Sequence, residues 1–256
     1  MKAMVLAAGL GTRLRPLTDG CPKALVTVAG RTLLEMILSR LRSFGVREVI
    51  VNVHHYAEMV VDYLKANDNF GMRIEVSREE VLLDTGGGLK KAAWFFLEAG
   101  ANTPSAEPID APFLVHNVDV LSSIDLAGVV RFQAEHNALA TLAVQDRETS
   151  RYLLFNEQGQ LCGRRAGRDA EPELARPVQP VEALAFSGIH VLSPRIFSKF
   201  QEEGAFPIID AYLHLAAQGE KILAFRADCA YWRDLGRPEN LLQAARDVAN
   251  GTYSGS

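Results

Sequence analysis

The chain has 256 residues, of which 48% are hydrophobic and 23% are charged, and these proportions are ordinary for a soluble globular protein. The formal net charge of −4 gives no electrostatic reason to expect nucleic acid as a partner. No apolar run approaches the ~20 residues that are needed to span a bilayer, so we expect no membrane association.

The three cysteines, Cys21, Cys162 and Cys229, are too few and too scattered for a disulfide framework or a cysteine-based metal site. The first predicted strand begins at Lys2, and no signal-peptide pattern precedes it. We therefore expect a cytoplasmic protein that is a monomer or a small homo-oligomer.

Strand and helix patterns alternate through the first half of the chain. An apolar strand is predicted over 2–7, and the nearly unbroken apolar run 49–53 predicts a strand that is covered on both faces. Thr32 and Glu35 form a capping box that opens an amphipathic helix, and Gly45 ends it. Further helices are predicted at 56–66, 87–97 and 126–136, and further strands at 72–77, 113–116 and 139–144.

This alternation predicts an α/β fold, with a Rossmann-like, mostly parallel sheet flanked by helices. Ligands of such sheets collect at the carboxyl ends of the strands. The second half differs, because segments 152–155 and 160–162 flank Asn156-Glu-Gln-Gly159, which is typical of a hairpin. The second half also contains predicted strands at 184–192 and 221–226 and predicted helices that begin near 193, 206 and 238. This pattern predicts a small antiparallel appendage that borders the site of a second substrate.

The first predicted strand runs into a glycine loop, Gly9-Leu-Gly11, which continues through Thr12 and Arg13 to Lys23. Glycines let the backbone turn sharply and let its N–H groups close on a phosphate. Arg13 and Lys23 add positive charge for the same anion. A loop of this composition at the end of the first strand predicts a site for a nucleoside triphosphate.

Two better-known phosphate loops do not fit this sequence. The dinucleotide fingerprint G-x-G-x-x-G requires glycine where Leu14 stands, and no G-x-x-x-x-G-K-[S/T] run occurs. The spelling that fits, from Gly9 to Lys23, is G-x-G-T-R-x-x-P-x-T-x-x-x-P-K. It resembles the signature of the nucleotidylyltransferases that act on sugar 1-phosphates, also called sugar-nucleotide pyrophosphorylases.

The resemblance implies that an NTP and a sugar 1-phosphate react to give an NDP-sugar and pyrophosphate, without a covalent enzyme intermediate. Arg13 and the loop backbone would hold the β- and γ-phosphates, and Lys23 would stabilise charge on the α-phosphate. Both side chains are then candidate catalytic residues. The implied nucleotide-binding residues of the loop are Ala8, Gly9, Gly11, Thr12, Arg13 and Lys23.

A divalent metal usually bridges protein and phosphate in nucleotidyl transfer, and Mg²⁺ prefers one or two carboxylates plus phosphate oxygens and water. The predicted strand at 113–116 runs out into Asn117-Val118-Asp119. In the family this turn commonly reads Asn/Gly-Gly-Asp and its aspartate binds the metal. The resemblance therefore implies that Asp119 is a catalytic Mg²⁺ ligand and that Asn117 binds nucleotide, although Val118 replaces the usual glycine; the alternative is an aspartate that caps the turn.

A second metal ligand is implied near the end of the chain. The segment Tyr231-Trp-Arg-Asp-Leu-Gly236 resembles the family's late W-x-D-x-G segment, whose aspartate or asparagine is that ligand. Asp234 stands at this position. The alternative is that Asp234 caps the helix that begins near Pro238.

A run of three glycines in Asp84-Thr85-Gly86-Gly87-Gly88 opens a predicted helix. Such a run allows close approach of a flat ligand and exposes helix N–H groups. In the family this loop packs on the nucleobase, and an upstream polar residue pairs with the base edge. The resemblance thus implies that Glu79, Thr85 and Gly86 bind nucleotide; a plain flexible loop is the alternative.

The sugar side is less clearly marked. Family members place a glycine-bearing strand against the sugar, which implies that Ser187 and Gly188 bind it, whereas an ordinary bulge is the alternative. The family motif Glu-Lys-Pro, whose lysine binds the sugar phosphate, is missing from 164–182. Arg164, Arg165 or Arg168 could replace that lysine, and the sequence does not choose between them.

We therefore predict one nucleotidylyltransferase domain over 1–256, with a nucleotide-binding half at about 1–145 and a sugar-binding half at about 146–256. UTP is favoured, because the triple glycine resembles the uridylyltransferase branch, and short members such as the N-acetylmuramate 1-phosphate uridylyltransferases are most similar. A mannose- or heptose-1-phosphate guanylyltransferase using GTP stays open, since Glu79 or Glu80 could accept from guanine. A catalytically silent nucleotide-sensing subunit on the same fold is the alternative from another class.

Overall fold

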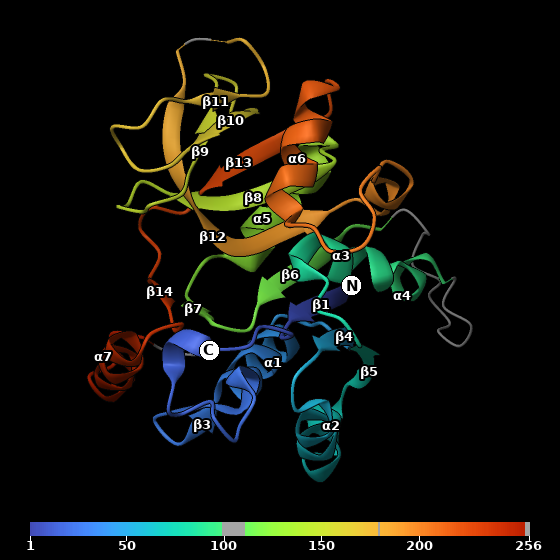
Figure 1. Ribbon diagram of the computed structural model, residues 1–256, viewed down its shortest axis with the longest axis vertical. Helices are drawn as coiled ribbons and strands as arrows, with labels where there is room; N and C mark the ends of the chain where they lie inside the picture. Colours follow the sequence, from blue (N-terminus) through green and yellow to red (C-terminus); the bar gives the residue numbers. More distant parts are fainter. Residues whose placement is uncertain (99–110, 179, 254–256) are drawn as a thin grey trace.

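The computed structural model describes residues 1–98, 111–178 and 180–253, and a ten-stranded sheet crosses this part of the chain (Figure 1). Its strands are β1 (Lys2–Leu6), β4 (Glu48–Val53), β5 (Arg73–Arg78), β6 (Phe113–Asn117), β8 (Ala140–Gln145), β9 (Tyr152–Phe155), β10 (Leu161–Arg165), β11 (Glu173–Leu174), β12 (Glu182–Leu192) and β13 (Ile222–Arg226). The order along the sheet is β11-β10-β9-β12-β6-β1-β4-β5, and β8 pairs with both β12 and β13. The α/β prediction is confirmed.

The strands of the N-terminal part are parallel. β1 pairs in parallel with β4 and with β6, and β4 pairs in parallel with β5. The carboxyl ends of these strands therefore lie at one edge, where the loop after β1 meets the turn after β6. Val118 N donates to Leu6 O across this junction at 3.0 Å.

Helices cover both faces of the sheet. They are α1 (Leu33–Ser43), α2 (Ala57–Ala66), α3 (Asp84–Lys91), α4 (Ala93–Leu97), α5 (Leu126–His136), α6 (Ile208–Ala217) and α7 (Pro238–Ala249), with 3-10 turns at Thr12–Leu14, Lys23–Leu25, Asp68–Gly71 and Pro194–Ser198. Thr32 Oγ1 accepts from Glu35 N at 3.0 Å, so the predicted cap of α1 is confirmed. The single helix predicted over 87–97 is instead two helices, α3 and α4. None of the helices in the described residues is long and apolar enough to cross a membrane.

Alternate residues of β1 enter two separate hydrophobic cores. Ala3 and Val5 belong to one core together with side chains of α1, α2, α5 and α7. Met4 and Leu6 belong to the other, with side chains of α3, α4 and α6. Because side chains alternate across a strand, these cores lie on opposite faces of the sheet, as the unbroken apolar strands predict.

The antiparallel strands that were predicted as a small appendage extend one side of the main sheet. β12 runs antiparallel to β6, β8 and β9, and β9, β10 and β11 follow it as an antiparallel ladder. The pairing of β12 with β8 shifts register between Phe186 and His190. Gly188 has a φ of +71° within this shift, so the interruption read from the sequence is a bulge inside the sheet.

Two shorter ladders complete the fold. One joins β2 (Thr27–Val28) to β3 (Arg31–Thr32), and the other joins β7 (Val120–Ser122) to β14 (Trp232–Asp234). In the β7–β14 ladder Asp234 lies opposite Val120, and Leu235 N donates to Asp119 O at 2.7 Å. This pairing, seen on one side of Figure 1, brings two distant parts of the chain to the carboxyl end of β6.

Candidate active site

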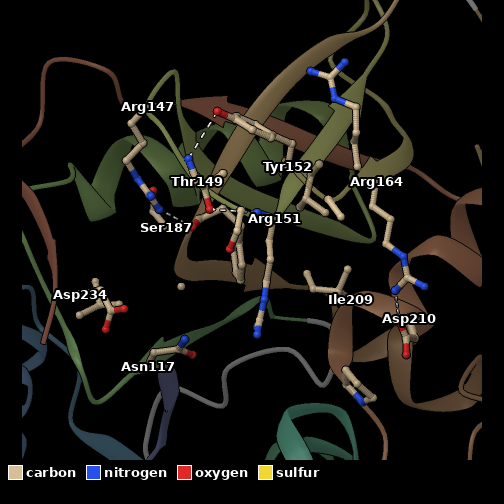
Figure 2. A pocket seen from close by; sticks show the side chains of 18 of the residues that line it. Asn117, Arg147, Thr149, Arg151, Tyr152, Arg164, Ser187, Ile209, Asp210 and Asp234 are labelled. Atoms are coloured by element: carbon tan, nitrogen blue, oxygen red, sulfur yellow. Dashed lines mark hydrogen bonds and ion pairs between the residues drawn. The ribbon is translucent and has the colours of Figure 1, made fainter. Parts of the chain in front are cut away.

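Two neighbouring cavities open at the carboxyl ends of β1 and β6. The smaller, of about 270 Å³, is bordered by the loop after β1 and by the start of α3. The larger, of about 730 Å³, is bordered mainly by residues of the second half of the chain (Figure 2). Asn117 and Asp119 line both cavities, so ligands bound in the two would meet beside these residues.

The glycine loop is held in a tight turn. Gly11 has a φ of +66°, and a Cβ at this position would lie 2.9 Å from Thr18 Cγ2. Thr18 Oγ1 donates to Gly11 O at 2.8 Å, which closes the turn. Only glycine combines this backbone conformation with this close approach. Ala8 and Gly9 precede the turn and line the smaller cavity.

Lys23 and Asp119 are in direct contact. Lys23 Nζ donates to Asp119 Oδ2 in an ion pair, and the two side chains are 9% and 21% exposed. The pair joins the glycine loop to the turn after β6. The lysine that the sequence assigns to the α-phosphate and the aspartate that it assigns to the metal are therefore brought together.

Asp234 and Arg13 reach the same region from opposite ends of the chain. Asp234 Oδ1 accepts from Gly236 N at 2.8 Å. A Cβ on Gly236 would lie 2.7 Å from Arg13 Nη2 and 2.8 Å from Asp234 Oδ1. Gly236 thus gives the guanidinium room beside the β14 segment, and Arg13, Asp119 and Asp234 all line the larger cavity.

The two aspartates fit a Mg²⁺ ion that is bound partly through substrate. Their contacts leave Asp119 Oδ1 and Asp234 Oδ2 without hydrogen-bond partners among the described residues. Within the same residues, no group of three or more His, Cys, Asp or Glu side chains could hold a metal ion. One or two carboxylates completed by phosphate oxygens and water are what Mg²⁺ prefers, so the donor set suits this ion.

A buried pair of polar side chains connects the two loops of the smaller cavity. Asn52 Oδ1 accepts from Ala7 N, and Asn52 Nδ2 donates to Glu79 Oε1, both at 2.7 Å. Glu79 Oε2 accepts from Leu83 N at 2.9 Å. Both carboxylate oxygens of Glu79 are therefore engaged within the protein, and its contact with a base stays a prediction.

The three glycines of α3 are required by packing within the protein. A Cβ on Gly86 would lie 2.3 Å from the ring of Phe206, and one on Gly87 would lie 2.3 Å from Gly204 O. Gly86 N already donates to Phe206 O at 2.9 Å. Gly86 and Gly87 thus make room for the segment before α6, and a Cβ on Gly88 would lie 2.6 Å from Glu79 Oε1. Contact of this loop with a base stays a prediction.

The sugar-side residues surround the bulge of β12. A Cβ on Gly188, where φ is positive, would lie 2.8 Å from Asn117 Nδ2, so glycine lets the bulge approach β6. Ser187 Oγ is buried without a hydrogen-bond partner in the described residues. Ser187 O accepts from Trp232 Nε1 at 2.9 Å, which ties the bulge to β14.

Most of the predicted site residues line one of the two cavities. Those at the smaller cavity are Ala8, Gly9, Lys23, Thr85, Asn117 and Asp119. Those at the larger cavity are Arg13, Asn117, Asp119, Ser187, Gly188 and Asp234. Four predicted nucleotide-binding residues, Gly11, Thr12, Glu79 and Gly86, line neither.

Three further residues at the cavities were not assigned from the sequence. Asn52 lines the smaller cavity, and its only signal is a polar side chain inside the apolar run 49–53. Arg147 and Trp232 line the larger cavity. Arg147 follows a predicted strand end, where ligands collect, but nothing in its neighbours marks it.

A model of the family described as "Nucleotidyl transferase" matches residues 2–251 of the chain. An N-acetylmuramate alpha-1-phosphate uridylyltransferase from Caulobacter vibrioides is 31% identical over 256 residues, covering 96% of both chains. A mannose-1-phosphate guanyltransferase from Yarrowia lipolytica is 29% identical over 94% of this chain. A UTP–glucose-1-phosphate uridylyltransferase from Synechocystis is 28% identical over 97% of this chain. The match spans 62% of the Yarrowia and 63% of the Synechocystis protein.

Solved structures share the fold at lower identity. HddC from Yersinia pseudotuberculosis, complexed with GMP-PN, has a TM-score of 0.72 and 21% identity, covering 96% of this chain and 99% of that chain. The inositol-1-phosphate CTP transferase from T. maritima has a TM-score of 0.71 and 17% identity, covering 99% of this chain and 98% of that chain. At these identities the likeness shows the fold alone.

Proposed function

This chain belongs to the nucleotidyl transferase family, and we propose that it transfers a uridylyl group from UTP to a sugar 1-phosphate, giving a UDP-sugar and pyrophosphate. As a member of that family it is a nucleotidyltransferase. The observation that carries the proposal is the meeting of the glycine loop, Asp119 and Asp234 at the junction of two cavities. One cavity would hold the nucleotide and the other the sugar 1-phosphate.

In the proposed reaction an oxygen of the sugar phosphate attacks the α-phosphorus of the NTP. The new oxygen–phosphorus bond forms while the bond to the β-phosphate oxygen breaks, and pyrophosphate leaves with that electron pair. Arg13 and the backbone of Ala8–Thr12 hold the β- and γ-phosphates. Lys23 stabilises the charge that develops on the α-phosphate, where a buried cation has its largest effect.

Asp119 and Asp234 are proposed to hold Mg²⁺. When bound, the ion would neutralise phosphate charge and orient the phosphate oxygens. The protein's own part is to keep one oxygen of each aspartate available, with Asp119 oriented by Lys23 and Asp234 oriented by Gly236 N.

The choice of UTP is supported by the Caulobacter relative, which is similar over nearly the whole length of both chains. The triple glycine resembles the uridylyltransferase branch, although packing against Phe206 and Gly204 already accounts for two of its members. GTP remains the second candidate, supported by the Yarrowia relative. Retention of Arg13, Lys23, Asp119 and Asp234 around the two cavities argues against a catalytically silent nucleotide-sensing subunit.

The proposal includes one nucleotidylyltransferase domain that acts in the cytoplasm as a monomer or a small homo-oligomer. The half at about 1–145 would bind the nucleotide, and the half at about 146–256 would bind most of the sugar.

The values of kcat/KM for UTP, dTTP and GTP test the base. A group left unpaired on a buried base edge costs about 1–3 kcal/mol, so UTP should exceed GTP by roughly tenfold to a hundredfold. A clear preference for GTP would replace the uridylyl assignment with the guanylyl one and leave the reaction standing.

A further inference from the structure

Arg147 lines the larger cavity without an ion pair to any carboxylate in the described residues. Its Nη2 donates to Phe186 O at 2.8 Å. Its guanidinium carbon lies 3.4 Å from the centroid of the Trp232 ring, which is a close cation–π contact. The side chain is thus held firmly, and no carboxylate of the described residues lies within ion-pair distance of it.

The bulge of β12 and the strand β14 fix this arginine. Phe186 O, where the register shift begins, accepts from Arg147, and Ser187 O accepts from Trp232 Nε1 at 2.9 Å. Trp232 and Asp234 belong to the same three-residue strand. One short strand therefore positions both the candidate metal ligand and the ring on which the guanidinium lies.

The environment of Arg147 favours an incoming anion. Burial lowers its pKa to about 10, and the charge of Asp234 opposes this effect. Arg147 Nε and Ser187 Oγ are both buried without hydrogen-bond partners in the described residues. A partly desolvated cation and an unpaired hydroxyl are costly in the free protein, and an anion that contacts them would offset that cost.

Four other arginines line the cavity, namely Arg13, Arg151, Arg164 and Arg165, and the Nε of Arg165 is also buried without a hydrogen-bond partner in the described residues. Arg164 is neutralised on the opposite side of the pocket by Glu173, 2.7 Å away, and by Asp210, 2.5 Å away (Figure 2). Arg168 does not line the cavity, and its Nε donates to Tyr152 Oη at 3.2 Å. Arg147 differs from these arginines because its guanidinium lies against Trp232, which belongs to the same strand as Asp234, and because the charge of Asp234 acts on it.

We propose that Arg147 binds the phosphate of the sugar 1-phosphate, in place of the family lysine that this chain lacks. The inference rests on the proposed function. The planar guanidinium, whose carbon lies 3.4 Å from the centroid of the Trp232 ring, carries N–H donors in a fork that can match two oxygens of a phosphate. This contact lies beside Asp234. It offsets the negative charge of the sugar phosphate while an oxygen of that phosphate attacks the α-phosphorus of the NTP.

Steady-state kinetics of Arg147→Gln, with the sugar 1-phosphate that wild type uses best, test the proposal. Loss of a charge-assisted contact should raise KM for the sugar 1-phosphate by about tenfold to a hundredfold and leave KM for the NTP within about twofold. Arg147→Lys keeps the positive charge but loses the forked N–H donors of the guanidinium. Its KM for the sugar 1-phosphate should lie between those of the wild type and of Arg147→Gln. Arg226→Gln is the matched control, because that arginine does not line the cavity.

Arg151→Gln, Arg164→Gln and Arg165→Gln are the informative comparisons, because these arginines line the same cavity. The proposal is overturned if any of them raises KM for the sugar 1-phosphate more than Arg147→Gln does, or if Arg147→Gln raises both KM values equally. Should Arg147→Gln not fold, Trp232→Phe is the second variant. It keeps an aromatic ring and loses the bond to Ser187 O, so a smaller rise in the same KM is expected, and an unchanged KM overturns the proposal.

A binding experiment tests this inference separately from the proposed function. The proposed function itself fails if the wild-type protein turns over no sugar 1-phosphate. The binding experiment uses inorganic phosphate as the probe, in calorimetry on an Arg13→Ala/Lys23→Ala background that removes the glycine-loop cations. Adding Arg147→Gln to this background should weaken phosphate binding by about tenfold. Equal affinity, or no binding with Arg147 present, overturns the assignment of Arg147.

Discussion

The two cavities differ in how their polar side chains are held. Around the smaller one the polar groups are buried and bonded to each other, with Asn52, Glu79 and Lys23 only 2%, 4% and 8% exposed. Around the larger one charged side chains remain open to solvent, as in the ion pair of Arg164 and Asp210, which are 42% and 38% exposed. The side proposed for the nucleotide is therefore preorganised, whereas much of the side proposed for the sugar is not.

This difference fits the two roles that are proposed for the cavities. Fixed donors and charges lower a reaction barrier most when no reorganisation is needed, which fits the buried network around the glycine loop. Side chains on exposed loops change more easily without loss of fold, which fits the arginine-lined sugar side.

The largest expected effect comes from the carboxylates at the junction of the cavities. Asp119→Ala and Asp234→Ala should each lower kcat by about a hundredfold or more, because loss of a metal ligand forfeits several kcal/mol of transition-state stabilisation. Pyrophosphate release at varied Mg²⁺ concentration measures this, and circular dichroism checks the fold. A variant with a normal rate and normal Mg²⁺ dependence would remove that residue from the metal site.

Substitution of Lys23 tests whether the fixed position of its charge stabilises the transition state. Lys23→Ala should lower kcat by roughly a hundredfold and change the affinity for the NTP less, because a cation beside the reacting phosphorus gains most as charge develops. Initial rates at varied NTP concentration separate the two effects. A rise in KM with kcat unchanged would make Lys23 an anchor of the ground state.

A third prediction concerns the glycines of α3. Gly87→Ala should destabilise the fold by about 2–3 kcal/mol, because its Cβ would meet a backbone oxygen that has little room to move. Gly20→Ala is the control, since a Cβ there would have nothing within 4 Å. Urea unfolding of both variants measures the difference. Equal stability would show that the packing of α3 on the segment before α6 is looser than described.

The smallest effect is expected at Glu79. Glu79→Gln turns one acceptor into a donor that faces Asn52 Nδ2 or Leu83 N, so stability should fall by about 1–2 kcal/mol. The preference between UTP and GTP should not change, because both carboxylate oxygens serve the protein. Competition between the two nucleotides tests this, and a shifted preference would give Glu79 the base-reading role that the sequence suggested.

Local patterns were sufficient to predict much of the fold. The capping box of Thr32 and Glu35, the apolar run 49–53 and the helix over 126–136 all depend on neighbours in the chain, and they match α1, β4 and α5. The glycine loop was readable because one continuous segment carries its glycines and cations.

Features that depend on distant partners could not be predicted in this way. The β7–β14 ladder that joins Asp119 to Asp234 has only three residues on each side, and no local pattern specifies its register. The packing of Gly86 on Phe206 could not be predicted, because Phe206 lies far along the chain. The position of the Arg147 side chain depends on contacts with the Trp232 ring and with the carbonyl oxygen of Phe186 at the bulge. The sequence around Arg147 does not show these contacts.

The central claim is that the two cavities hold an NTP and a sugar 1-phosphate that react with each other. Pyrophosphate release, measured over a matrix of four NTPs and several sugar 1-phosphates with each component omitted in turn, tests it most directly. We predict release only when Mg²⁺, an NTP and a sugar 1-phosphate are all present. Nucleotide binding without pyrophosphate release over a broad panel would contradict the claim and favour a nucleotide-sensing subunit.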